Sequence, residues 1–123
     1  MDKILIVDDD QGTTKLLEFI LSKEGYDVAS VNEGTETVST ALAYHPNLIL
    51  LDVMMPSMDG LEVCRDLRAE SNFAHVPIVF FSSASDVDKK VAAFGSGAND
   101  YIVKPIHPRE LKLRIKALIG HQG

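Results

Sequence analysis

Carboxylates, a hydroxyl and an ammonium group follow directly on short apolar runs of this sequence. The run "ILIV" leads into Asp8 and Asp9, and "LILL" ends on Asp52. In the same way "IVFF" ends on Ser82 and "YIV" ends on Lys104. Three carboxylates brought together would repel one another unless a cation neutralised them, and oxygen ligands of this kind suit Mg²⁺ or Mn²⁺. A lysine and a hydroxyl beside them can hold a tetrahedral anion. The set therefore predicts a site for a divalent metal and a phosphoryl group, with an aspartate as nucleophile.

Each of these residues also has an ordinary structural interpretation. The acidic stretch Asp8 to Asp10 could cap a following helix, because Asp is common at that position. Asp52 could open a turn, Ser82 could begin a helix, and a single lysine such as Lys104 is most often solvated. These interpretations explain each residue alone, but not why four run ends supply Asp-Asp, Asp, Ser and Lys in that order.

The elements that would position these residues alternate along the chain. Short β-branched or aromatic runs predict strands, and longer segments with helical spacing lie between them. The runs are Ile4–Val7, Val28–Val31, Leu48–Leu51, Ile78–Phe81 and Tyr101–Val103. They are apolar throughout, which favours strands buried on both faces of a parallel sheet covered by helices.

Five strands favour an α/β doubly wound (βα)5 sheet in the flavodoxin-like order 2-1-3-4-5, because a closed barrel needs about 250 residues. In this order the first and third strands are neighbours. Ligands bind beyond their carboxyl ends, at the point where the strand order reverses. That arrangement would bring Asp8, Asp9 and Asp52 together.

Two of the predicted helices carry clear apolar stripes. The stripe of the first is formed by Leu16, Leu17, Ile20 and Leu21, and that of the fourth by Val87, Val91 and Phe94. The fourth stripe is thin and is followed by Gly95-Ser96-Gly97, which indicates local looseness there.

The size and charge of the chain limit the possible classes of protein. The chain has 123 residues, of which 46% are hydrophobic, and its net charge is -6. We therefore expect one domain over residues 1–119, with residues 120–123 as a tail or the start of a linker. The acidic balance argues against nucleic-acid or anionic-membrane binding by this domain. The single cysteine, Cys64, and the lack of a long apolar run predict a cytoplasmic protein.

Four stretches of the chain resemble the receiver domain of two-component response regulators. They are "ILIVDDD", "LILLDVMMPSMDG", "PIVFFSSAS" and "GANDYIVKP". The resemblance extends from Lys3 to about Ile119, and the spacing between Asp52, Ser82 and Lys104 also fits the family.

The resemblance implies a role for each residue of the site. Asp52 would accept a phosphoryl group from a phosphohistidine on a sensor histidine kinase or a histidine phosphotransfer protein. Asp9, Asp52 and the backbone carbonyl of Met54 would ligate Mg²⁺ directly, and Asp8 would act largely through water. Such a protein is not an enzyme in the usual sense, although it takes part in its own phosphorylation and slow dephosphorylation.

Three further residues would respond to the phosphoryl group, which adds about −1.5 to −2 charges. Lys104 would pair with its oxygens, Ser82 would hydrogen-bond them, and Tyr101 would turn inward as the switch aromatic. The Lys104–Pro105 bond is typically cis in the family. The expected result is a changed surface formed by the fourth helix, the fifth strand and the last helix. That surface would alter binding to a downstream target or output domain, or drive dimer formation.

The lifetime of the phosphoryl group is also predicted by the resemblance. In this family, polar residues at the positions of Met54 and Ala84 are associated with rapid self-dephosphorylation because they orient water. Neither residue here is polar in that sense, and we therefore expect a long-lived phosphoryl group.

Two alternative functions remain open on the sequence. A degenerate receiver could serve as a docking module that needs no phosphorylation. A haloacid dehalogenase-like phosphohydrolase also uses a strand-end Asp, Mg²⁺ and Lys. However, many of those enzymes carry a second Asp two residues after the nucleophile, where this chain has Met54.

Overall fold

The protein is a five-stranded parallel sheet with the order β2-β1-β3-β4-β5, as predicted. The computed structural model describes residues 2–53, 55, 59–83, 86–105 and 107–120. The strands are β1 (Lys3–Val7), β2 (Asp27–Val31), β3 (Leu48–Asp52), β4 (Ile78–Ser82) and β5 (Asp100–Val103). Each predicted apolar run lies within a strand, which confirms that the unbroken apolar stretches were strands of a buried sheet.

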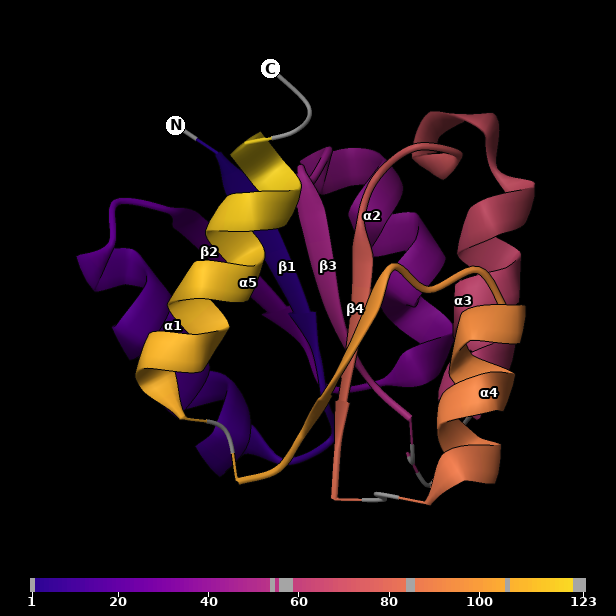
Figure 1. The fold of residues 1–123 in the computed structure, drawn as a ribbon. Helices are drawn as coiled ribbons and strands as arrows, with labels where there is room; N and C mark the ends of the chain where they lie inside the picture. The colour runs from indigo at the N-terminus through magenta and orange to yellow at the C-terminus, as the bar shows by residue number, and fades with distance from the viewer. Residues whose placement is uncertain (1, 54, 56–58, 84–85, 106, 121–123) are drawn as a thin grey trace.

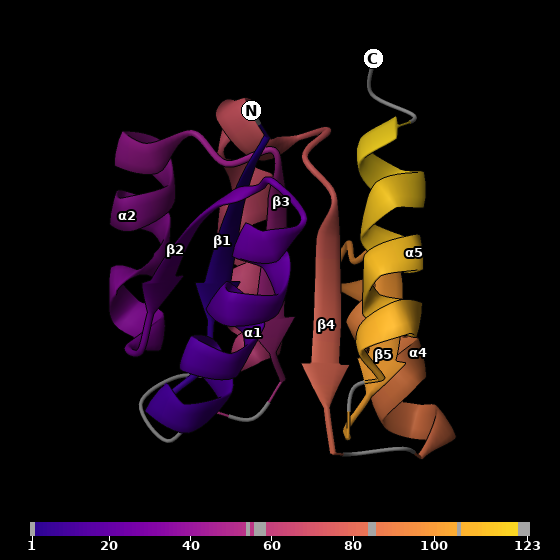
Figure 2. The same cartoon turned by 90° about the vertical axis from the view of Figure 1, so that its left-hand side faces the viewer.

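Helices cover both faces of this sheet (Figure 1; Figure 2). They are α1 (Gln11–Lys23), α2 (Thr37–Tyr44), α3 (Gly60–Ala69), α4 (Val87–Gly95) and α5 (Pro108–Gly120), with short 3-10 turns at Gly34–Glu36 and Ser71–Phe73. Helices α1 and α5 lie on one face, and α2, α3 and α4 lie on the other. This is the three-layer doubly wound architecture expected from the alternation of elements.

Alternate residues of each strand enter one or the other of two apolar cores. In β1, Ile4 and Ile6 pack with α1 and α5, whereas Leu5 and Val7 pack with the helices of the opposite face. Strands β3 and β4 are buried along their whole length. The central strands are therefore held on both sides, and their carboxyl ends are rigidly placed.

The apolar stripe of α4 has a different environment from the other helices. Val87, Val91 and Phe94 share a face as predicted, but they are 72%, 64% and 49% exposed. The buried residue of α4 is Ala93. In α1, Leu16 of the predicted stripe is likewise exposed, while Leu17 and Leu21 are buried. The helical period was right in both cases, but it did not distinguish the inner face from the outer one.

The part of the chain that the structure describes holds no helix that is both long enough and apolar enough to cross a bilayer.

Candidate functional site: carboxylates at the carboxyl end of the sheet

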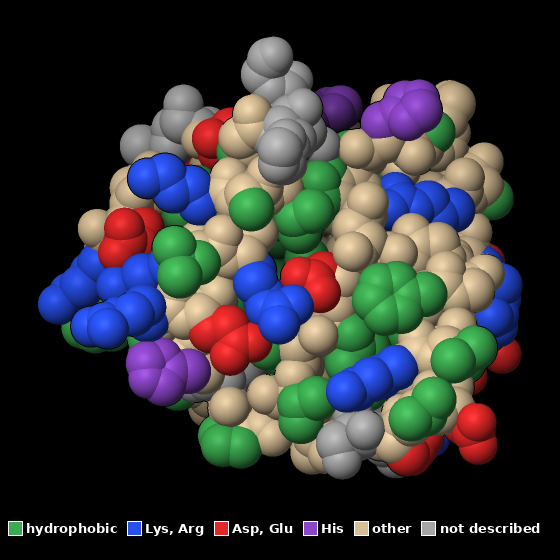
Figure 3. Space-filling model, in the orientation of Figure 1, with side chains coloured by type: hydrophobic (Ala, Val, Ile, Leu, Met, Phe, Trp, Pro, Cys, Tyr) green, Lys and Arg blue, Asp and Glu red, His purple; other side chains and the backbone are tan. Residues whose placement is uncertain are grey.

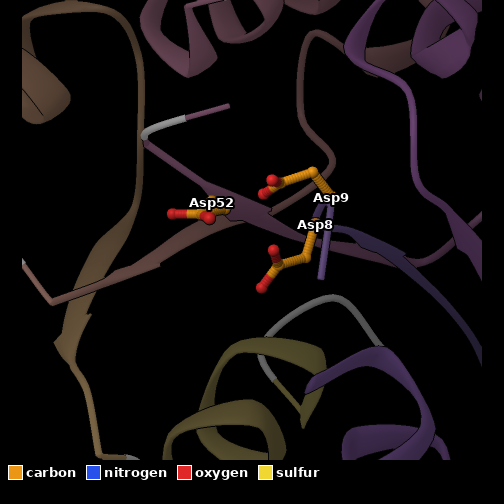
Figure 4. Close-up of side chains that lie close together, drawn as sticks. All are labelled: Asp8, Asp9 and Asp52. Carbon is orange, nitrogen blue, oxygen red and sulfur yellow. The ribbon is translucent and has the colours of Figure 1, made fainter. Parts of the chain in front are cut away.

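Neighbouring strands bring the predicted carboxylates to one edge of the sheet. Val7 of β1 pairs in register with Leu51 of β3, so that the residues that follow them, Asp8 and Asp52, leave adjacent strands at the same level. Asp8, Asp9 and Asp52 each offer a carboxylate oxygen, and these three oxygens lie within 4.8 Å of one another. Figure 4 shows the three side chains coming from the two strand ends.

Asp8 is held firmly at the centre of this group. It is 1% exposed, and its Oδ1 accepts a hydrogen bond from the backbone N–H of Asp10 at 3.0 Å. Its own N–H donates to the Val31 carbonyl of β2 at 3.1 Å, and its carbonyl accepts from Nδ2 of Asn32 at 2.8 Å. Contacts at the end of β2 therefore hold the backbone of Asp8, and the N–H of Asp10 holds its carboxylate.

Lys104 places one positive charge between two of the carboxylates. Its Nζ lies 3.1 Å from Oδ2 of Asp8 and 3.7 Å from Oδ2 of Asp52. The same ammonium group lies 4.8 Å from the centre of the Phe81 ring, at a distance where a cation and an aromatic face attract. Lys104 follows β5, and its N–H donates to the Ser82 carbonyl at 2.7 Å. The Lys104–Pro105 peptide is cis, as predicted.

Negative charge is in excess at the site. Partial burial raises the pKa of Asp9 above 3.8, and the neighbouring Asp8 carboxyl raises it further. Among the described residues, three carboxylates meet here and Lys104 forms ion pairs with two of them, so its single charge cannot neutralise all three. Clustered carboxylate oxygens with an uncompensated charge form a donor set that fits a small divalent cation such as Mg²⁺.

Ser82 and Tyr101 lie next to this site on β4 and β5. Ser82 ends β4 and is 1% exposed, one sheet position away from the level of Asp52. Tyr101 is buried, and its ring centre lies 6.4 Å from that of Phe80. The structure thus brings Asp8, Asp9, Asp52, Ser82 and Lys104 to one edge of the sheet, with Tyr101 buried on β5. Met54 and Ala84 lie outside the described residues.

The helix-capping interpretation holds for Asp10 and not for its two neighbours. Asp10 is the residue before α1, and its carboxylate accepts from the N–H of Gly12 at 3.1 Å and from Oγ1 of Thr13 at 2.7 Å. These hydrogen bonds, that of Thr13 first, lower the pKa of Asp10. Within the acidic run, Asp10 therefore caps α1, whereas Asp8 and Asp9 belong to the carboxylate site.

An Asp10→Ala variant is expected to lower the thermal midpoint of unfolding, whereas Asp10→Asn should retain most of it because Asn also caps helices. Because folding lowers the pKa of Asp10, the charged carboxylate of Asp10 stabilises the fold above pH 3.8. This stabilisation is lost as the pH falls through the lowered pKa. Circular dichroism melts of both variants at neutral and acidic pH measure this. Equal midpoints for the two variants at neutral pH would contradict the capping role.

Two contributors to the site were not singled out from the sequence. Gly60, at the start of α3, packs against the backbone at the end of β3: a Cβ there would clash with the Asp52 carbonyl oxygen. An Asp-Gly pair such as Asp59-Gly60 is typical of a turn, but it gives no sign of this close approach. The ring of Phe81 in β4 contacts the ammonium group of Lys104, whereas the sequence predicted only that this strand is buried.

Comparison with known proteins identifies the family. Residues 4–116 match the sequence profile of the response regulator receiver domain, and the chain belongs to that family. The receiver domain of RstA from Klebsiella pneumoniae, solved in its BeF3-activated form, is 32% identical with a TM-score of 0.89, covering 96% of this chain and 98% of that one. The receiver domain of a sensor histidine kinase from Pseudomonas aeruginosa, solved with a magnesium ion in its active-site cleft, is 30% identical with a TM-score of 0.89, covering 97% and 98%.

Curated relatives are longer than this chain. A probable transcriptional regulator, ycf27, from Porphyridium aerugineum is 45% identical over 96% of this chain and 48% of its own length. The DNA-binding response regulator MtrA from Mycobacterium tuberculosis is 43% identical over 94% of this chain and 49% of its own length. The chain therefore spans about half the length of these relatives.

Proposed function

We propose that this receiver domain is a phosphorylation-activated switch that accepts a phosphoryl group on Asp52. The donor is a phosphohistidine of a sensor histidine kinase or of a histidine phosphotransfer protein. The observation that carries this proposal is the placement of Lys104 Nζ 3.7 Å from Oδ2 of Asp52, within a group of carboxylates whose oxygens lie within 4.8 Å of one another. A nucleophile, a cation for phosphoryl oxygens and a set of metal ligands thus meet at one strand edge.

The transfer forms one bond and breaks another. A carboxylate oxygen of Asp52 attacks the phosphorus atom, and the bond from phosphorus to the donor's imidazole nitrogen breaks. The electron pair of that bond stays on the imidazole nitrogen. Lys104 then exchanges its contact with Asp52 for the new phosphoryl oxygens, which carry more negative charge than the carboxylate did.

Asp8, Asp9 and Asp52 are the described residues that would hold Mg²⁺, or Mn²⁺ in its place, and the backbone carbonyl of Met54 would be a further ligand. When bound, the cation neutralises charge on the carboxylates and on the oxygens of the transferring phosphoryl group. Support comes from the excess of carboxylates over ammonium groups at the site, and from the raised pKa of Asp9.

Removal of one carboxylate should abolish most of the stabilisation that magnesium gives. Without Mg²⁺, an Asp9→Asn variant is expected to unfold at a higher temperature than the wild type, because it relieves repulsion from Asp8. With millimolar Mg²⁺ the wild type should gain stability and the variant should gain little, since the ligand is gone. Thermal melts across a Mg²⁺ titration measure both. An equal gain for the variant would contradict the role of Asp9 as a ligand.

The switch would reach the surface through β4 and β5. Ser82 is buried at the carboxyl end of β4, Tyr101 is buried as the second residue of β5, and α4 and α5 cover opposite faces of the sheet on either side of β5 (Figure 1). Inward movement of Ser82 toward the phosphoryl oxygens would change the packing of Tyr101 and so the surface formed by α4, β5 and α5. That surface would bind a downstream protein, an output domain or, on phosphorylation, a second copy of the chain. We propose that this takes place in the cytoplasm, without direct contact of this domain to nucleic acid.

The test of this function is intact mass after incubation with acetyl phosphate, with and without Mg²⁺. One phosphoryl adduct that depends on Mg²⁺ is the expected result. The adduct should persist in the purified protein after the donor is removed, because Met54 and Ala84 lack the polar groups that would orient water for dephosphorylation. A folded protein that forms no adduct with this donor or with a phosphohistidine protein would instead favour the docking module.

A further inference from the structure

One arginine of α3 binds several segments of the chain at once. The Nε of Arg68 donates to the Gly97 carbonyl at 2.9 Å, and its Nη1 donates to the carbonyls of Phe73 and Val76, both at 2.6 Å. Its Nη2 donates to Oδ1 of Asn99 at 2.7 Å. Four hydrogen bonds from one guanidinium group therefore connect α3 to the segment before β4 and to the segment between α4 and β5.

Asn99 extends this connection into the sheet. Its Oδ1 also accepts from the N–H of Ile78 at 2.9 Å, and its own N–H donates to the Ile78 carbonyl at 2.8 Å. Ile78 is the first residue of β4, and Asn99 directly precedes β5. Arg68 is thus tied, through Asn99, to the amino ends of the two strands whose carboxyl ends carry Ser82 and Lys104.

The carboxyl end of α4 packs against the same arginine. Gly97 has φ +110, its N–H donates to the Phe94 carbonyl at 3.1 Å, and the N–H of Ala98 donates to the Ala93 carbonyl at 3.3 Å. This is the glycine-ended cap that terminates many helices. A Cβ on Gly97 would lie 2.9 Å from Cγ of Arg68, so the cap and the arginine are in close contact. A cation at this place also complements the negative end of the helix dipole.

The amino half of α4 is held much more weakly. Val87 and Val91 are 72% and 64% exposed, and Ala93, near the other end, is the buried residue of the helix. The amino end is capped by Asp86, whose Oδ1 accepts from the N–H of Lys89 at 2.8 Å within the same segment. Attachment of α4 to the rest of the fold is therefore concentrated at its carboxyl end.

We propose that Arg68 anchors the carboxyl end of α4, so that α4 moves as a helix pivoting about residues 96–99 while its amino half swings. The signal-dependent part of this inference rests on the proposed phosphoryl switch, whereas the anchoring itself does not. Lysine cannot replace Arg68 in this role, because its point charge lacks the planar fork of N–H groups that reaches Gly97, Val76 and Asn99 together.

Hydrogen exchange measured by mass spectrometry tests the anchor without phosphorylation. In the wild type, amides of residues 96–99 should exchange more slowly than those of 87–91. An Arg68→Lys variant should exchange about tenfold faster at 96–99, the factor expected when hydrogen bonds to a charged group are lost. Arg65→Lys is the matched control on the exposed side of α3, and it should match the wild type. Unchanged exchange at 96–99 in Arg68→Lys would overturn the proposal.

A second variant covers the case in which Arg68→Lys does not fold. Asn99→Ala removes one of the four acceptors and leaves the three carbonyls to Arg68, so it is a milder change. Faster exchange at residues 96–99 and at Ile78 is expected. Exchange equal to that of the wild type would again overturn the anchoring.

The pivot is tested by the same measurement after treatment with acetyl phosphate and Mg²⁺, with intact mass recorded on each sample. Where the adduct forms, wild-type exchange should change at residues 87–91 and stay constant at 96–99, whereas in Arg68→Lys the change should reach residue 99. Equal changes in both segments of the wild type would overturn the pivot. A missing adduct both with this donor and with a phosphohistidine protein would refute the phosphoryl switch instead, and the unphosphorylated comparison would still decide the anchor.

Discussion

An Asp52→Asn variant is expected to accept no phosphoryl group from acetyl phosphate or from a phosphohistidine protein. The amide nitrogen and oxygen that replace the carboxylate are far weaker nucleophiles, and one ligand for the metal is lost at the same time. The variant should stay folded, because Lys104 retains its 3.1 Å ion pair with Asp8 and one of three clustered negative charges has been removed. Intact mass with circular dichroism on the same sample measures both outcomes.

Asp10→Asn is the matched control for this substitution. It also converts a carboxylate near the carboxyl end of β1 into an amide, but Asp10 caps α1 and lies outside the group formed by Asp8, Asp9 and Asp52. It should form the adduct at the wild-type rate. An adduct on Asp52→Asn as large as that on the wild type would mean that Asp8 or Asp9 accepts the phosphoryl group, and the assignment of Asp52 would then be wrong.

The sheet and the carboxylate group could be predicted from the sequence because both follow from short-range patterns. Unbroken apolar runs mark buried strands, and strand order then determines which strand ends are neighbours. Asp8 and Asp52 therefore had to meet once β1 and β3 were adjacent, and the structure places them so. The same logic extends to Ser82 and Lys104 at the ends of β4 and β5.

What the sequence could not predict depends on contacts between elements. Helical period shows that Val87, Val91 and Phe94 share a face, but α4 rests on the fold through the small residue Ala93, so the large residues point to solvent. Nothing in the sequence distinguishes Arg68 from a solvated arginine of a helix surface. Its carbonyl partners belong to loops whose path becomes known only with the fold. Apolar character alone therefore shows neither which face of α4 packs on the sheet nor what anchors its carboxyl end.

Replacement of Gly60 by Ala is expected to be among the most destabilising single changes in the chain. A Cβ at this position would clash with the Asp52 carbonyl oxygen and would lie 2.8 Å from both Cα and the carbonyl oxygen of Val53. All of these are backbone atoms of the segment that carries Asp52, so the clash cannot be relieved by rotating a side chain. The N–H of Gly60 also donates to the Val53 carbonyl at 2.9 Å, which holds the two segments together.

The expected cost is about 3 kcal/mol in the free energy of unfolding, at the upper end for overpacking because backbone must move. Urea denaturation measures it, with Gly95→Ala as the control. Gly95 ends α4 and has nothing within 4 Å of its would-be Cβ, so alanine there should leave stability equal or slightly raised. Because the displaced atoms include the carbonyl of Asp52, Gly60→Ala should also slow adduct formation under conditions where it is still folded. Equal stability of the two variants would mean that the start of α3 can move away from β3 without strain, and that the carboxylate of Asp52 is positioned by β3 alone.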